Sequence, residues 1–497
     1  MEKKVQADAA RMPSFWEAFA SFAFLIALMA ISVVVFDVSL HVPMMFAAAF
    51  AAIVAKRCGY RWKQIEKGMF NGIYAALPAI LILCVVGALI GVWLLAGIVP
   101  SMIYYGLAIL NPQLFLVTAL FIGSITSLAT GTSWGTASTI GVAFMGIGIG
   151  LGIPAPMAAG AVISGAYFGD KISPLSDTTN LTASIAGTDL FTHIKCMFKQ
   201  TGIAYALTVI VFLVLGFMHT PAAEGPGAEY IRQGLQEHFT ISPLLLIPPV
   251  AVIVAISFKV PALPGIFIGV VLGAIFGMIA QGVSFGEVLS VGRGGFSIST
   301  GTPELDRLLS RGGIAGMMYS VSLTILAMAF GGIMELTRQL EVVVERIIKL
   351  FVRGTTSLVA TTVGTTIATN ATMPEQYISI ILPTKMFATA YRKRGFHPKM
   401  LSGAVDGTGT LTSSLIPWNT CGIFMASILG VTAFQYAPFA VLNWSVPIII
   451  IVLAALGKFT YKLKDDPSGV TSAYEETFAD ETDAEGAEGQ ASATETK

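Results

Sequence analysis

Eight apolar runs in this chain are each near the length of a membrane-spanning helix. They lie at residues 15–36, 42–55, 72–98, 201–218, 242–258, 263–281, 313–336 and 440–457. About 20 mostly apolar residues cross the hydrocarbon core of a bilayer as an α-helix. The 497 residues are 55% apolar and only 12% charged, which excludes a soluble globular domain. The sequence therefore predicts an all-α polytopic membrane protein whose surroundings are a lipid bilayer.

Two further stretches, residues 114–187 and 358–430, are apolar but crowded with Gly, Ser, Thr, Asn and Pro. Backbone groups left unpaired in lipid cost several kcal/mol each, so interrupted segments persist only where protein or a watery cavity covers them. We therefore expect each stretch to contain a re-entrant hairpin and an interrupted transmembrane helix, and we expect the functional site there.

The two stretches are related to each other in sequence. Residues 157–162 align with 400–405, and the match continues without a gap through Pro174 against Pro417 to the glycines at 187 and 430. Upstream, residues 128–134 resemble 367–373 after a shift of a few positions. The chain thus contains an internal repeat of a hairpin followed by a broken helix.

The charges of equivalent loops predict that the repeats have inverted topology. Loops 101–111 and 151–156 carry no charge, whereas their counterparts at 338–353 and 391–399 are basic. After the broken helix the contrast reverses, with lysines at 195 and 199 and none at 431–442. By the positive-inside rule the copies face opposite ways, which places a transport site near the bilayer midplane.

The same reasoning divides the chain into five parts. These are a cytoplasmic N-terminus (1–14), a first membrane half with repeat 1 (15–218), an external linker (219–240), a second membrane half with repeat 2 (241–460) and a disordered acidic cytoplasmic tail (461–497). We expect a multi-pass protein of the cell (inner or plasma) membrane with both termini cytoplasmic.

Repeat 1 places two carboxylates, Asp170 and Asp177, at membrane depth. Burial favours a bound proton and a bound cation favours the ionised form, so competition for Asp177 could couple sodium to protons, with Asp170 in support. We expect Na⁺ at Asp177, Thr178 and Asn180. Other expected ion-coordinating residues of this repeat are Thr132, Ser133, Ser176 and Thr179. The alternatives are that Asp170 pairs with Lys171 and that Asp177 caps the helix beginning near Thr178.

Repeat 2 has fewer acids. Glu375 and Asp406 are candidates for binding a cation or proton, and Thr369, Asn370 and Asn419 are candidates for coordinating the ion. Alternatively, Glu375 caps the returning arm of the hairpin, and Asp406 pairs with Lys385.

Enzyme chemistry finds no support in the sequence. The five histidines form no H-E-x-x-H motif, no Walker phosphate loop is present, and the four cysteines have no paired spacing. Net charge is zero, so no overall field recruits nucleic acid. We expect no enzyme activity, no cofactor and no nucleic-acid partner.

Three motifs resemble those of the NhaC family of sodium/proton antiporters. They are Gly131-Thr-Ser-Trp-Gly-Thr136, the run from Gly169 to Asn180, and Leu415-Ile-Pro-Trp-Asn-Thr-Cys421. The resemblance implies the inverted-repeat architecture of the ion transporter superfamily, exchange of Na⁺ for H⁺ and a homodimer. It also implies that the cation is handled by Asp170, Asp177, Thr178, Thr179 and Asn180, with Asn419 in the matching motif.

Two other functions remain open at this point. The family includes proteins similar to malate/lactate antiporters, so Na⁺- or H⁺-coupled exchange of small organic anions or amino acids is the alternative. A lysine at 171 or 385 facing the cavity would favour it. A channel is disfavoured because paired interruptions indicate one occluded midplane site.

Overall fold

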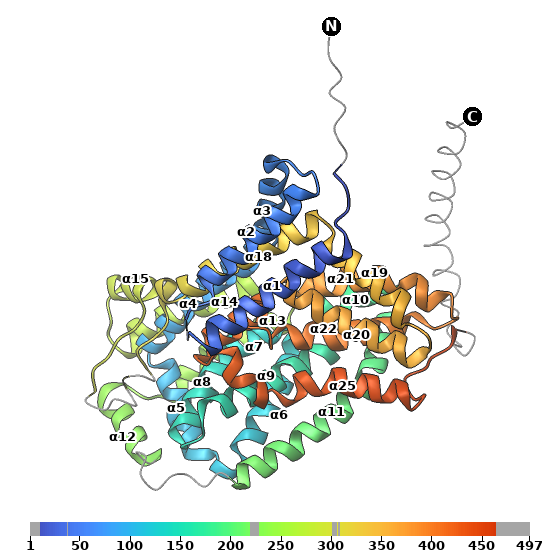
Figure 1. The fold of residues 1–497 in the computed structure, drawn as a ribbon. Helices are drawn as coiled ribbons and strands as arrows, with labels where there is room; N and C mark the ends of the chain where they lie inside the picture. Colours follow the sequence, from blue (N-terminus) through green and yellow to red (C-terminus); the bar gives the residue numbers. More distant parts are fainter. Residues whose placement is uncertain (1–9, 37, 219–227, 301–305, 307–308, 464–497) are drawn as a thin grey trace, which may run out of the picture.

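The computed structural model describes residues 10–36, 38–218, 228–300, 306 and 309–463 (Figure 1). Within these ranges the secondary structure is helical except for one isolated bridge between Phe396 and Lys462. Six of the described helices are long and apolar enough to cross a membrane, or up to eight if each sharply bent pair is one span. This confirms the all-α polytopic class. Most of the predicted N-terminal segment and acidic tail, and residues 219–227 of the predicted linker, lie outside the described residues.

The predicted apolar runs form helices close to their expected bounds. These are α1 (Phe15–Val34), α2 (His41–Arg57), α4 (Leu77–Leu95), α11 (Leu190–Met218), α13 (Ile247–Ser257), α14 (Ala262–Ala280), α18 (Met318–Leu336) and α25 (Val441–Ala455). Between them lie α3 (Trp62–Ala75), α5 (Ile98–Ile109), α12 (Ala228–His238), α15 (Phe285–Gly294), α17 (Gly313–Gly316) and α19 (Gln339–Phe351). α12 falls within the predicted linker, and α11 begins earlier than expected because its first turns are amphipathic rather than apolar.

The internal repeat appears as a hairpin followed by a broken helix in each copy. In repeat 1 the elements are α6 (Phe115–Thr130), α7 (Ser133–Thr136), a π-helical turn (Ala137–Gly141), α8 (Val142–Gly150), α9 (Ala155–Ile172) and α10 (Asp177–Ala186). In repeat 2 they are α20 (Thr355–Thr372), α21 (Gln376–Arg392), α22 (Pro398–Ser413) and α23 (Thr420–Leu429), with α21 standing where repeat 1 has α7, the π-helical turn and α8. α10 packs against α21 and α22, so the repeats interlock at the centre of the molecule (Figure 1).

The second arms of the two broken helices match in detail. α10 and α23 each have 10 residues, and both begin after a side-chain cap, supplied by Ser176 and Asn419. Both end at a glycine in the left-handed region, Gly187 at φ 73° and Gly430 at φ 71°. These positions correspond in the sequence alignment, so the duplication extends to the backbone. The opposite orientation of the repeats in the membrane stays a prediction.

Proline explains where the helices break. α9 ends at Ile172 and α22 ends at Ser413, and Pro174 and Pro417 lie in the gaps that follow. Proline has no N–H to donate, and it disfavours helical backbone in the residue before it. The expected interruption in each repeat is therefore present.

Close contact between α6 and α9 fixes the position of the first break. A Cβ at Gly169 would overlap the carbonyl oxygen of Ser124, so only glycine allows this approach. We expect Gly169→Ala to destabilise the protein by about 1–3 kcal/mol through overpacking and to displace the neighbouring Asp170. The measurement is the midpoint of thermal unfolding in detergent. Gly202→Ala in α11 is the matched control, since nothing lies within 4 Å of its added carbon, and an equal loss there would contradict the packing argument.

Candidate functional site

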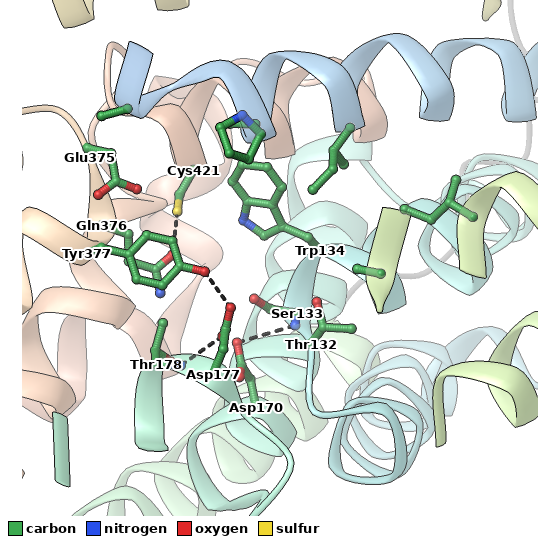
Figure 2. Close-up of a pocket in the computed structure, with 16 residues that line it drawn as sticks. Thr132, Ser133, Trp134, Asp170, Asp177, Thr178, Glu375, Gln376, Tyr377 and Cys421 are labelled. Carbon is green, nitrogen blue, oxygen red and sulfur yellow. Dashed lines mark hydrogen bonds between the residues drawn. The ribbon is translucent and has the colours of Figure 1, made fainter. Parts of the chain in front are cut away.

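A cavity of roughly 150 Å³ lies where the breaks of the two repeats meet. Its polar wall comes from the tips of both hairpins, the break between α9 and α10, and the start of α23 (Figure 2). Apolar side chains such as Pro78 and Ile82 of α4 close the remaining side. Three carboxylates line this one cavity, those of Asp170, Asp177 and Glu375. They come from both repeats, although more than 190 residues separate Asp177 from Glu375 in the chain.

Asp177 is the first residue of α10 and is solvent-exposed. Its Oδ1 accepts a hydrogen bond from the backbone N–H of Thr178 at 2.8 Å. Its Oδ2 accepts one from the hydroxyl of Tyr377, which belongs to the other repeat (Figure 2). The helix cap is Ser176, so the interpretation of Asp177 as the cap is wrong. Its carboxylate lines the cavity with one hydrogen bond on each oxygen.

Asp170 is only 4% exposed. One carboxylate oxygen accepts the backbone N–H of Ser133 at 3.3 Å, whereas Oδ1 is buried and has no hydrogen-bond partner among the described residues. A buried carboxylate oxygen without a partner is costly, and a proton or a cation would supply the missing interaction. The alternative ion pair between Asp170 and Lys171 is not formed, because the Lys171 ammonium bonds elsewhere.

Glu375 both caps a helix and reaches the cavity. It caps α21, where its side chain accepts the backbone N–H of Ile378 at 3.1 Å. It also lines the cavity while only 8% exposed.

Asp406 lies outside the lining of this cavity, in a buried cluster between the repeats. The Lys171 ammonium lies 2.7 Å from Asp406 Oδ1 and also donates to the hydroxyls of Thr178 and Thr410, at 2.8 and 2.9 Å. His193 Nε2 lies 3.1 Å from Asp406 Oδ2. The partner of Asp406 is therefore Lys171 and not Lys385, as the alternative had it. Lys171 does not face the cavity.

The neutral candidates divide into two groups. Thr132, Ser133 and Thr178 line the cavity, and Asn180 lines an adjoining pocket that also contains Asp177. The other candidates lie outside this lining, namely Ser176, Thr179, Thr369, Asn370 and Asn419.

Two of these outer residues, Asn370 and Asn419, form hydrogen bonds between segments of repeat 2. Asn370 Nδ2 donates to the Gly409 carbonyl at 2.7 Å, and Asn419 Nδ2 donates to the Asn370 carbonyl at 3.1 Å. Together they hold the second hairpin against its broken helix.

Sequence reasoning missed three groups at or near the cavity. Tyr377 bonds to Asp177, the Cys421 thiol lies 2.7 Å from the side-chain oxygen of Gln376, and His193 belongs to the charged cluster. Tyr377 follows Glu375 and Gln376 at the hairpin tip, so its place there was a usable signal. No sequence pattern connects His193 to Asp406.

The electrostatics of the cavity favour a cation. The N-termini of α10 and α21 lie at it, and their partial positive charges help to keep its carboxylates ionised but oppose a cation, so the attraction for a cation comes from the carboxylates themselves. The residues that line the cavity include three acids and no lysine, arginine or histidine. A small cation would be drawn to this site and held by carboxylate and hydroxyl oxygens.

The helices and this cavity define a multi-pass membrane protein with an acidic site between two repeats. The family model described as "Na⁺/H⁺ antiporter family" matches residues 165–458. The chain is 38% identical to the malate-2H⁺/Na⁺-lactate antiporter of Bacillus subtilis (strain 168), over 92% of this chain and 97% of that protein.

Two further relatives are similar to this chain over most of their length. Identity is 37% with the Na⁺/H⁺ antiporter NhaC of Alkalihalophilus pseudofirmus, over 87% and 94% of the two chains. It is 34% with the arginine/ornithine antiporter ArcD of Halobacterium salinarum, over 94% and 97%. The chain belongs to the Na⁺/H⁺ antiporter family, which confirms the resemblance of its motifs to NhaC proteins.

Proposed function

We propose that this protein exchanges Na⁺ for H⁺ at the cavity between the repeats. The observation that carries this proposal is that three carboxylates from both repeats line one small cavity without a basic side chain. In this mechanism a sodium ion and a proton take turns on Asp177, while Asp170 and Glu375 set the negative potential that draws them in. An ionised carboxylate without a bound ion is costly to move through a low-dielectric interior. The protein therefore changes between its two access states more easily when Asp177 holds a sodium ion or a proton.

The sodium ion would be held by Asp177, Thr178 and Asn180, with Thr132 and Ser133 completing its oxygen shell. Thr132 and Asp177 support this set because they line both the cavity and the adjoining pocket that contains Asn180, whereas the Thr178 hydroxyl already accepts a hydrogen bond from the Lys171 ammonium at 2.8 Å. The adjoining pocket, of about 510 Å³, is also lined by Lys259 of the α13–α14 loop. We name it the Lys259 pocket and propose that it is the cytoplasmic access path.

The proposed setting is the cell membrane, with both termini cytoplasmic and with a homodimer as the assembly. The orientation rests on the basic loops that the positive-inside rule places in the cytoplasm. An accessibility test of cysteines introduced at 259 and 237, both exposed positions, from each side of the membrane would check it.

The proposal is tested with purified protein in liposomes that carry a pH gradient. Adding Na⁺ without any organic solute is expected to dissipate the gradient, because sodium and protons alone suffice for exchange. Choline in place of sodium is the control. No response to sodium at any imposed gradient would overturn the proposal.

Exchange of a cationic amino acid is the second candidate. An acidic cavity suits a positively charged substrate, and one relative is named as an arginine/ornithine antiporter. An organic anion fits less well, since no basic group lines the cavity. In the same liposomes, dissipation that begins only when arginine or ornithine is added would favour the amino acid, and dissipation that needs malate or lactate would favour the anion.

Tyr377 is expected to weaken sodium binding, because its hydroxyl occupies an oxygen of Asp177 that the ion needs. Hydrogen bonds to charged groups contribute about 1.5–3 kcal/mol. We expect Tyr377→Phe to lower the half-saturating sodium concentration by about tenfold or more. The measurement is the initial rate of gradient dissipation against sodium concentration. An unchanged or higher half-saturating concentration would show that the hydroxyl does not compete with the ion.

A further inference from the structure

A second pocket repeats the Lys259 pocket at matching positions of the other repeat. We name it the Ser39 pocket; it measures about 510 Å³ and is lined in part by Ser39, Tyr319, Pro417 and Ile423. In the repeat alignment Pro417 and Ile423 correspond to Pro174 and Asn180, both of which line the Lys259 pocket. Each pocket therefore lies against the broken helix of one repeat.

One further wall corresponds, whereas others do not: Thr130–Thr132 of the first hairpin line only the Lys259 pocket, and Tyr319, Ser320 and Leu323 of α18 line only the Ser39 pocket. The Lys259 pocket is completed by residues 259–262, at the connection of α13 and α14 in the second half. The Ser39 pocket is completed by residues 38–40, at the connection of α1 and α2 in the first half. Counting spans from the predicted cytoplasmic N-terminus and from the predicted external linker places these two connections on opposite sides of the membrane.

The two pockets differ in their access to the acidic cavity. On the repeat 1 side, Asp177, Asn180 and Ser184 of α10 are exposed, and Asp177 lines both the cavity and the Lys259 pocket. On the repeat 2 side, the corresponding Thr420 and Ile423 of α23 are each only 3% exposed. The corresponding faces of α10 and α23 are thus exposed in repeat 1 and covered in repeat 2.

Two contacts cover α23 on the repeat 2 side. The hydroxyls of Ser320 in α18 and Ser427 in α23 are hydrogen-bonded, and Ser427 corresponds to the exposed Ser184 of repeat 1. Phe424 of α23 is fully buried and stacks on Trp134, which lines the cavity, with ring centroids 4.0 Å apart. Trp134 lines the cavity, and Ser320 lines the Ser39 pocket, so α23 is held by one contact at each.

We propose that the Ser39 pocket is the second entrance of the transport path, on the side of the membrane opposite to the Lys259 pocket. In this structure the Ser320–Ser427 and Trp134–Phe424 contacts close it. Its lining has hydroxyl and amide groups but no carboxylate, lysine or arginine, and His41 is hydrogen-bonded behind Ser39 and Tyr319, so a hydrated monovalent cation can pass without being retained. The inference rests on the proposed transport function but not on which cation is carried.

Labelling of single introduced cysteines tests the sidedness without reference to any cargo. Ser184→Cys and Ser427→Cys are placed in the full-length protein in sealed vesicles of known orientation and treated with a membrane-impermeant maleimide. The native protein gives the background of the four native cysteines. We expect Ser184→Cys to react from one side and Ser427→Cys from the opposite side only. Reaction of both from the same side, or no reaction of Ser427→Cys, would overturn the proposal.

Locking the contact tests its role in transport. The double variant Ser320→Cys/Ser427→Cys is oxidised and assayed for sodium-driven gradient dissipation, with its reduced form as the reference. We expect oxidation to lower the rate at least about tenfold and reduction to restore it, while each single variant is insensitive to the oxidant. A verified cross-link that leaves the rate unchanged would overturn the proposal. If the native protein shows no response to sodium, the proposed function fails. The labelling result still shows whether the Ser39 pocket opens to the side opposite to the Lys259 pocket.

Discussion

Asp177→Asn is expected to lower sodium-dependent gradient dissipation by about a hundredfold or more. Asparagine keeps the shape of the side chain but removes the charge and the titratable proton. Two unit charges about 4 Å apart near a protein surface attract by roughly 4 kcal/mol, and every 1.4 kcal/mol is about a factor of ten in affinity. The variant can neither balance the charge of a sodium ion nor carry a proton. The measurement is the initial rate in liposomes at saturating sodium for the native protein.

Asp189→Asn is the matched control for this prediction. Asp189 is exposed at the start of α11, where its side chain accepts the backbone N–H of Thr192 at 2.8 Å. Asparagine caps a helix as well as aspartate does, so exchange and stability should stay near native. Native-like exchange in Asp177→Asn would show that the proton and sodium bind elsewhere, with Asp170 and Glu375 the next carboxylates to replace.

Lys171→Met is expected to destabilise the protein by about 3–5 kcal/mol. The side chains of Lys171 and Asp406 are both fully buried, and removing one partner of a buried ion pair leaves the other charge uncompensated. Asp406 would retain only His193 and the hydroxyl of Thr410 as polar partners. The measurement is the midpoint of thermal unfolding of purified protein in detergent.

A double-variant cycle distinguishes this cause from a simple loss of packing. Lys171→Met combined with Asp406→Leu removes both charges, so it should be more stable than the sum of the single changes predicts. Lys385→Met is the control, because Lys385 is exposed and its replacement should change stability by less than about 0.5 kcal/mol. Additive effects of the two single variants would show that the pair contributes little as a pair.

The ion pair between Lys171 and Asp406 could not be predicted from the local sequence. Asp170 and Lys171 are adjacent, which favoured a local pair, yet side chains of successive helical residues point about 100° apart. α9 buries Lys171 toward α22, where Asp406 follows 235 positions later. Asp170 remains on the cavity side. Only the packing of one repeat against the other decides which carboxylate is neutralised by lysine and which stays available to an ion.

The sequence by itself determined the membrane class, the spans, the repeat and the two breaks. These follow from local causes, namely the length of apolar runs, the missing N–H of Pro174 and Pro417, and matching residues in the two copies. It also named the three carboxylates of the cavity. The structure decided that Asp170, Asp177 and Glu375 share one cavity, that Tyr377 reaches Asp177, and that Asn370 and Asn419 brace the fold. The physical reason is that contacts between distant segments depend on how helices pack, which no local pattern specifies.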